Sequence, residues 1–77
     1  MTKREEAEMI SNKLTDRQRE NIKSIAELYK LGEVENISSI KNQALWGMNY
    51  YLRGLQDADC ITDYESKMLW NYYTFQL

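Results

Sequence analysis

The sequence predicts an all-α protein, a small bundle of about four helices, from three observations. Three capping boxes mark helix starts in a chain of only 77 residues. In each, a threonine hydroxyl accepts from the backbone N–H three residues later, where a glutamate or glutamine reaches back. Apolar residues follow at the spacing of one helix face. The chain has no proline, and no alternating pattern typical of a strand competes.

The first two helices are expected over residues 3–13 and 16–31. Each follows a capping threonine, Thr2 in the first case and Thr15 in the second. Apolar side chains three and four positions apart then form one inward face per helix. These faces consist of Ala7, Ile10 and Leu14 in the first helix and of Ile22, Ile25, Ala26 and Tyr29 in the second.

The second helix is expected to end at residue 31, just before Gly32, because glycine adopts the left-handed conformation that follows a helix C-terminus without steric cost. Val34 and Ile37 are then expected to anchor the connection to the core. A third helix is expected over residues 37–58, with most of its apolar residues on one face. That face consists of Ile37, Ile40, Ala44, Met48, Tyr51, Leu52 and Leu55.

Two glycines, Gly47 and Gly54, lie inside the third helix, and each costs roughly 1 kcal/mol relative to alanine. Close approach of another helix is the usual compensation. Alternatively, Gly54 ends the helix early and Leu55 makes the hydrophobic contact of a helix cap. A fourth helix is expected over residues 63–75, after the Thr62 capping box. Its inward residues are expected to be Tyr64, Met68, Tyr72 and Phe75.

Residues 1–77 are expected to form a single helical domain, because a chain this short supports only one core. Cys60 is the only cysteine, so no internal disulfide can form, and histidine is absent. A lone thiol and a charged N-terminus without an apolar segment indicate a reducing, cytoplasmic location. No stretch approaches the ~20 apolar residues that a membrane span needs, so no membrane association is expected.

Catalysis is not expected, and neither is a cofactor or a metal ion. The chain lacks histidine, a glycine-rich phosphate loop and a nucleophile elbow. Four carboxylates surround the turn before the fourth helix, namely Asp57, Asp59, Asp63 and Glu65. They are interpreted as turn and cap residues in preference to a divalent-cation site. Cys60, in the same turn, is interpreted as a half-buried turn residue rather than a reactive thiol.

DNA binding through a helix-turn-helix is an alternative from a different class. The third helix would then be the recognition helix, after a short glycine-containing turn. Its leading polar residues, suited to phosphates and bases, are Ser38, Ser39, Lys41, Asn42 and Gln43. The charge distribution disfavours this alternative, since residues 31–77 hold three basic and six acidic side chains. A DNA-binding protein normally has a net basic face.

The third and fourth helices carry more apolar surface, most of it aromatic, than one inward face needs. The surplus residues are Trp46, Tyr50 and Arg53 in the third helix and Trp70, Tyr73 and Leu77 in the fourth. Within each helix the three lie on one face, off the main apolar one. These side chains either close a thin core or bind a partner. Tryptophan, tyrosine and arginine are enriched at interface hot spots, which favours the second interpretation.

One short segment resembles the C-terminal helical hairpin called SHOCT. Its residues are Leu55-Gln56-Asp57-Ala58-Asp59-Cys60-Ile61-Thr62-Asp63-Tyr64-Glu65-Ser66-Lys67. The family pattern is roughly L-x-D-A-G-x-I-T-x-E-E-F-x-x-K. This chain has Asp59 where the family has glycine, and a shorter stretch after Thr62. The resemblance implies a helical hairpin and no particular activity.

In size, composition and use of lysine, asparagine, isoleucine and tyrosine, the chain is also similar to accessory proteins of bacteriophages and mobile elements. Such proteins often bind and inhibit a host enzyme, including CRISPR nucleases. The surplus aromatic surface predicts a non-enzymatic protein-binding module, and the resemblance implies an inhibitor or regulator of a host nucleic-acid-handling enzyme. A structural homodimer is a third option. The expected partner-binding residues are Trp46, Tyr50, Arg53, Trp70, Tyr73, Asp57, Asp59 and Asp63.

Overall fold

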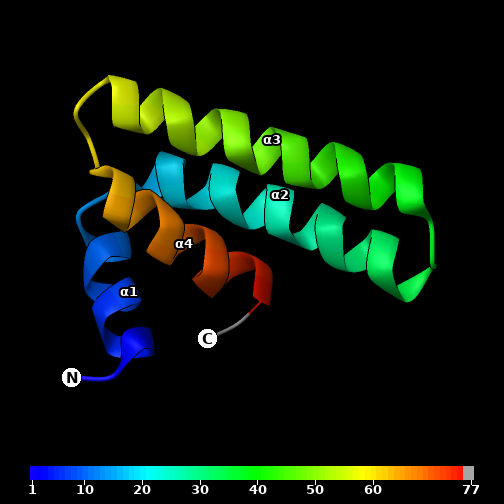
Figure 1. The fold of residues 1–77 in the computed structure, drawn as a ribbon, viewed down its shortest axis with the longest axis horizontal. Coiled ribbons are helices and arrows are strands. Elements are labelled where there is room, and N and C mark those ends of the chain that lie inside the picture. The colour runs from blue at the N-terminus through cyan, green and yellow to red at the C-terminus, as the bar shows by residue number, and fades with distance from the viewer. Residues whose placement is uncertain (76–77) are drawn as a thin grey trace.

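Four α-helices make up the fold in a computed structural model that describes residues 1–75. In chain order they are α1 (Lys3–Asn12), α2 (Asp16–Val34), α3 (Ser38–Asp57) and α4 (Asp63–Phe75), as Figure 1 shows. No strand occurs among these residues. The predicted all-α bundle of four helices is therefore confirmed. No helix in this part of the chain is long and apolar enough to cross a membrane.

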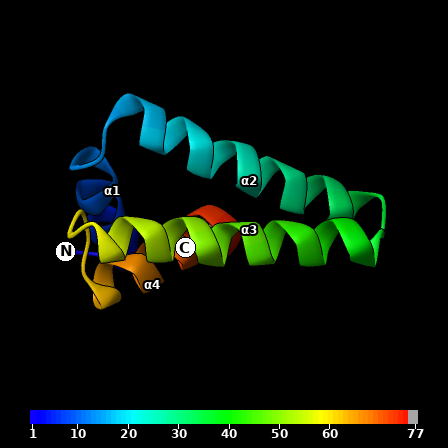
Figure 2. The ribbon, with the colours of Figure 1, turned by 90° about the horizontal axis from the view of Figure 1, so that it is seen from above.

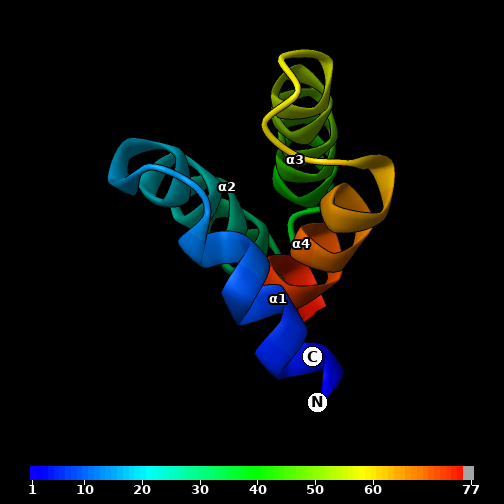
Figure 3. The same ribbon diagram turned by 90° about the vertical axis from the view of Figure 1, so that its left-hand side faces the viewer.

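The two long helices, α2 and α3, form an antiparallel hairpin (Figure 1, Figure 2). Helices α1 and α4 pack together at the end of the hairpin where α2 begins and α3 ends, and Figure 3 looks onto that end. From there α4 runs back along the hairpin for part of its length. The turn between α2 and α3 therefore lies beyond both short helices (Figure 1).

The hydrophobic core lies in the part of the hairpin that α1 and α4 cover. Its largest fully buried side chains are Ile22, Met48, Leu52 and Leu69. Helix α1 adds Ala7 and Ile10, and Leu14 follows from the short connection to α2. The inward residues expected for α1 are thus confirmed, and Ile22 and Ala26 of α2 are buried as expected. In α3 the burial of Ala44, Met48, Leu52 and Leu55 also agrees with the expected face.

All three capping boxes are formed. In each, the threonine hydroxyl accepts from the backbone N–H three residues later at 3.1 Å, and the side chain there accepts from the threonine N–H at 2.8–3.1 Å. The pairs are Thr2 with Glu5, Thr15 with Gln18, and Thr62 with Glu65. Each box satisfies two backbone N–H groups that a helix start otherwise leaves without an acceptor.

The end of α2 differs from the prediction. The helix continues through Gly32 to Val34, and Asn36 takes the left-handed conformation with a φ of 55°. The Ile37 N–H donates to the Gly32 carbonyl at 2.8 Å, and the Asn36 N–H to the Glu33 carbonyl at 3.2 Å. This is the Schellman arrangement, in which asparagine replaces the usual glycine. The prediction that α2 ends at residue 31, just before Gly32, was therefore wrong.

Val34 and Ile37 do not anchor this turn to the core. Val34 is 80% exposed, and Ile37 is exposed as well. The turn lies at the end of the hairpin that α1 and α4 do not reach (Figure 1), so no third layer is present there to bury these side chains. The expectation that both residues pack into the core was wrong for this reason.

Helix α3 does not end early at Gly54. It reaches Asp57, and Asp59 has the left-handed φ of 61°. The Cys60 N–H donates to the Leu55 carbonyl at 2.9 Å, a second Schellman arrangement. Because the chain turns away there, the Cys60 side chain is exposed rather than half-buried as expected.

The inward face of α4 is rotated relative to the expected one. Met68 is buried as expected, and Tyr72 packs partly buried against the core. Tyr64 and Phe75, however, are 56% and 57% exposed. Leu69, outside the expected face, is fully buried. Two of the four inward residues expected for α4 were therefore wrong.

An ion pair joins α1 to α4. The Lys13 ammonium, at the end of α1, donates to the Glu65 carboxylate of the last capping box. This contact, followed by the Thr62 N–H, holds the pKa of Glu65 below its ordinary value of 4.5. A pKa lowered by folding adds stability above the unfolded pKa, and that stability is lost as the pH falls through the folded pKa. The Lys13–Glu65 pair therefore stabilises the fold at neutral pH.

Replacing Glu65 with glutamine is expected to lower the free energy of unfolding at pH 7 by about 0.2–1 kcal/mol. Glutamine keeps the capping-box acceptor but removes the charge that faces Lys13. The difference between wild type and variant should shrink as the pH falls below 4.5, because wild-type Glu65 then becomes protonated. Urea denaturation of both proteins across this pH range measures the effect. A difference that does not change with pH would contradict the role of the charge.

Candidate functional site

An exposed aromatic pair stands on the outer face of α3. Trp46 is 60% exposed and Tyr50 63% exposed, although both side chains are large and mostly apolar. They are spaced i, i+4, so they lie one above the other on the helix. Their rings stack, with 5.8 Å between centroids and 24° between planes. The stacked pair therefore presents a continuous apolar surface to solvent.

Two charged residues continue this row along α3. Arg53 and Asp57 follow at i+7 and i+11 from Trp46, on the same face, and both are exposed. Asp57 is the last residue of α3, where the partial negative charge of the helix end disfavours a carboxylate. Helix capping therefore does not explain Asp57. The four residues Trp46, Tyr50, Arg53 and Asp57 are called the α3 row below.

A groove between α3 and α4 borders the α3 row. It consists of two adjoining hollows, of about 310 and 410 Å³, that share Asn49 and Trp70. Trp46 and Trp70 line the first hollow together, so one indole comes from each helix. Trp70 is half-buried and also packs against the core. The other lining residues are Asn42, Leu45, Asp63, Ser66, Lys67 and Asn71.

The acids beside the α3–α4 turn differ in how well local structure explains them. Asp63 pairs with Lys67 at 3.2 Å and lies in the first turn of α4, where negative charge is favourable. Asp59 supplies the left-handed residue that ends α3. Both positions follow from turn and cap chemistry. Asp57 alone among the three expected acids stands where the helix gains nothing from it.

Tyr73 lies apart from the other expected aromatic residues. It is half-buried, and its hydroxyl is 2.6 Å from the hydroxyl of Ser11 on α1. It therefore faces α1 and α2, whereas Trp70 lines the groove on the α3 side. The structure brings Trp70 beside Trp46, on which Tyr50 stacks, and places Tyr73 on the other side of α4. Leu77, expected beside Tyr73, lies outside the described residues.

The residues expected for DNA binding lie near the far end of the hairpin. Ser38, Ser39, Asn42 and Gln43 are exposed, whereas Lys41 is half-buried and packs on Gly32. In a helix-turn-helix the two helices cross at about 90–120°. Here α2 and α3 lie side by side and antiparallel (Figure 2), and α3 gives its inner face to the core. This geometry supports DNA reading by α3 less well than protein binding.

Several groove residues were not identified from the sequence. Leu45, Asn49, Ser66 and Lys67 form no recognisable motif, and they belong together only because α4 folds back beside α3. The one local signal is their spacing, since Leu45 and Asn49 are one turn apart and Ser66 and Trp70 are likewise. That spacing shows which residues share a face, but not which faces meet.

No family model, curated protein or solved structure matched this chain. The geometry of the α3 row and of the adjoining groove therefore carries the functional interpretation.

Proposed function

We propose that this chain is a non-enzymatic protein-binding module that receives a helix of its partner in the groove between α3 and α4. The observation that carries the proposal is the stacked Trp46–Tyr50 pair, exposed beside that groove. Such a pair contributes little to the core, because more than half of each side chain is in water. On a binding surface the same residue types supply most of the binding energy.

The composition of the groove favours an amphipathic helix as the bound element. Leu45, Trp46 and Trp70 provide apolar surface for the anchoring side chains of a helix. Asn49 offers amide donors and acceptors, and the Asp63–Lys67 pair offers charges at the α4 side. Helix-in-groove recognition combines such an apolar floor with a polar rim.

The class of partner follows from the charge beside the aromatic pair. Asp57 and Asp59 are exposed carboxylates at the end of the α3 row. Residues 31–77 carry three basic and six acidic side chains, so this half of the chain attracts a basic surface. Enzymes that handle nucleic acid present such surfaces. We therefore extend the proposal to an inhibitor or regulator of a host nucleic-acid-handling enzyme, of the kind that phages and mobile elements encode.

Replacing both Trp46 and Tyr50 with alanine is expected to abolish partner capture without unfolding the protein. Substitutions of exposed side chains usually change stability by no more than about 0.5 kcal/mol each. Truncating a hot-spot residue costs about 2 kcal/mol or more of binding free energy. The measurement compares proteins captured from bacterial lysate by the immobilised wild type and the variant, followed by the affinity of each captured partner. A melting curve of the variant accompanies it.

Leu31→Ala provides the matched control, because Leu31 is about half exposed (49%) and lies on α2, away from the groove. This variant should capture the same partners as wild type with the same affinity. Unchanged capture by the Trp46/Tyr50 double variant would exclude the α3 row as the binding surface. A double variant that no longer folds would show that the pair belongs to the core.

The wild type and the Trp46/Tyr50 double variant also test the two other interpretations, a structural homodimer and a DNA-binding regulator. Light scattering over a dilution series tests the structural homodimer, which requires a wild-type dimer that the Trp46/Tyr50 double variant converts to monomer. A DNA-binding regulator requires affinity for duplex DNA that falls steeply as salt rises. It also requires that this affinity be unchanged in the double variant.

A further inference from the structure

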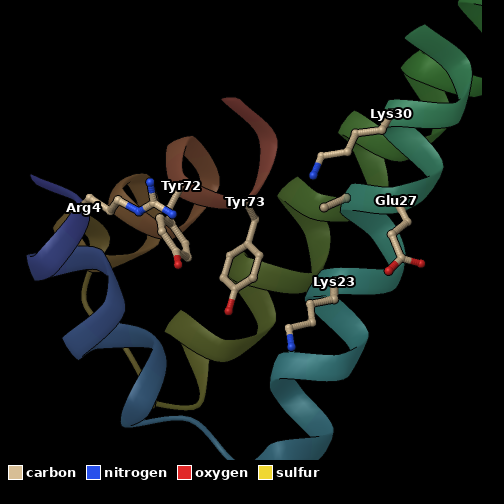
Figure 4. A pocket seen from close by; sticks show the side chains of 7 residues that line it. Arg4, Lys23, Glu27, Lys30, Tyr72 and Tyr73 are labelled. Carbon is tan, nitrogen blue, oxygen red and sulfur yellow. The ribbon is translucent and has the colours of Figure 1, made fainter. Parts of the chain in front are cut away.

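A second cleft lies on the other side of α4, between α1, α2 and α4. It has a volume of about 390 Å³, within the range of small-molecule sites. Figure 4 shows the side chains that line it. They are Arg4 of α1, Lys23, Ala26, Glu27 and Lys30 of α2, and Tyr72 and Tyr73 of α4. None of them belongs to the α3 row or to the groove.

Three cations gather in this cleft. Figure 4 shows Lys23 and Lys30 reaching from α2 toward the two tyrosines, while the carboxylate of Glu27 points away from them. Arg4 approaches from α1, on the opposite side of the tyrosines. Counting Arg4, Lys23 and Lys30 against Glu27 leaves the lining with a net charge of +2. A cleft of this charge, in a chain whose net charge is −2, concentrates anions.

The acids near these cations hold them only weakly. Arg4 contacts Glu8 through its Nε at 3.4 Å, and both side chains are largely exposed. Lys23 lies 3.9 Å from Glu20, again at the surface. Within residues 1–75, no carboxylate lies within 4.0 Å of the Lys30 ammonium. Exposed pairs of this kind are readily exchanged for a better anion.

The two tyrosines add hydrogen-bond donors and ring surface. Burial, with a smaller contribution from Glu8, raises the pKa of Tyr72, so its phenol stays protonated at neutral pH and donates to the Glu8 carboxylate over a long 3.4 Å contact. The Tyr73 hydroxyl can donate into the cleft when the Ser11 hydroxyl donates to it, at 2.6 Å. The two rings pack edge to face, with centroids 5.0 Å apart. They form the apolar part of the cleft.

We propose that this cleft binds a phosphate monoester the size of a nucleotide. A phosphate monoester carries about −1.5 to −2 charges at pH 7 and three acceptor oxygens, which match the three cations that line the cleft and the Tyr73 hydroxyl. A carboxylate carries only one negative charge and would leave some of the cations in the cleft without a partner. The tyrosine rings provide a surface for a sugar or base next to the phosphate, because aromatic rings stack on such groups.

The experiment is a titration of the protein with adenosine monophosphate, followed by amide signals in nuclear magnetic resonance spectra. Adenosine and inorganic phosphate serve as reference probes. Saturable shifts centred on the cleft residues are expected with the nucleotide, and none with adenosine. A Lys23→Gln/Lys30→Gln double variant should bind at least about tenfold more weakly, since two of the three cations are lost. Lys67→Gln, an exposed lysine at the α3–α4 groove, should bind like wild type.

Three results would each overturn the proposal: no saturable shift with the nucleotide, equal shifts with adenosine, or unchanged affinity in the lysine double variant. Inorganic phosphate that binds as tightly as the nucleotide would overturn the inferred ligand size.

A melting curve establishes that the double variant folds, and Arg4→Gln tests the same site from α1. An oligonucleotide with and without a 5′-phosphate distinguishes the end of a strand from a free nucleotide as the source of the phosphate. The Trp46/Tyr50 double variant should bind the nucleotide normally, so the two proposals fail separately.

Discussion

Replacing Leu69 with alanine is expected to destabilise the protein by about 2–5 kcal/mol. Leu69 has no exposed surface and lies in the core cluster near the middle of α4. The variant loses the burial of the side chain and leaves a cavity that the helices close only in part. A domain of 77 residues has a total stability of about 4–12 kcal/mol at 0.05–0.15 kcal/mol per residue. The loss is therefore a large fraction of the whole.

Thermal unfolding followed by circular dichroism measures this effect. In domains of this size each 1 kcal/mol lowers the melting temperature by about 4–8 °C, so the Leu69→Ala variant should melt at least about 8 °C below wild type. Leu31→Ala makes the same chemical change at a half-exposed position of α2 and should lower it far less. Equal losses in the two variants would show that α4 does not pack into the core as described.

The inward face of α4 could not be predicted from periodicity because apolar and aromatic residues lie around most of the helix. A face that runs from Tyr64 to Phe75 satisfies the helical spacing as well as the face that includes Leu69. The polarity of the side chains and their positions along α4 explain which of the two faces is buried. The Tyr64 hydroxyl donates to Glu6 at 2.7 Å at the surface, and Phe75 packs edge-on against Tyr29 at the end of the helix. Leucine has no polar atom to satisfy, so it takes the central position.

Three helix starts were predictable from local sequence, whereas the end of α2 was not. A capping box is local, so Thr2, Thr15 and Thr62 identified the starts from four residues each. The ends depend on which residue adopts a positive φ. Asn36 and Asp59 do so here, although each costs more than a glycine in that conformation. A rule that looks for glycine therefore misplaces the end of α2. For α3 the glycine alternative at Gly54 was wrong, whereas the expected range to residue 58 places the end within one residue of Asp57.

The candidate site was predictable in part for the same reason. The α3 row follows from spacing within one helix, and the exposure of Trp46, Tyr50 and Arg53 agrees with their place off the main apolar face. Which residues of α4 join them depends on how α4 packs against α3. Trp70 lines the groove beside Trp46, whereas Tyr73, three residues later, faces α1. The cleft lined by Arg4, Lys23 and Lys30 likewise takes its lining residues from three helices, so no pattern within a single helix predicts it.

The three glycines are expected to respond to alanine in opposite directions. A Cβ at Gly32 would lie 2.8 Å from the backbone nitrogen of Lys41 and 3.1 Å from Ile40 Cγ2, so α2 and α3 must move apart to admit it. Overpacking of this kind costs typically about 1–3 kcal/mol. Alanine gains about 0.5–1 kcal/mol over glycine in a helix, which offsets only part of that cost. Gly32→Ala should therefore be destabilised by about 1 kcal/mol, and by no more than about 2.5 kcal/mol, in urea unfolding.

Gly54→Ala should be stabilised by about 0.5–1 kcal/mol, because a Cβ there meets nothing within 4 Å and only the helical preference of alanine acts. Gly47→Ala should behave similarly, since its Cβ would make an ordinary contact with Ile25 at 3.9 Å. The close approach of helices that the sequence suggests for Gly47 and Gly54 is found instead at Gly32. If Gly32→Ala were stabilised as much as Gly54→Ala, α2 and α3 would be farther apart near their turn than the structure places them. If alanine lowers the free energy of unfolding at Gly32 and raises it at Gly54, the close contact between α2 and α3 lies at Gly32.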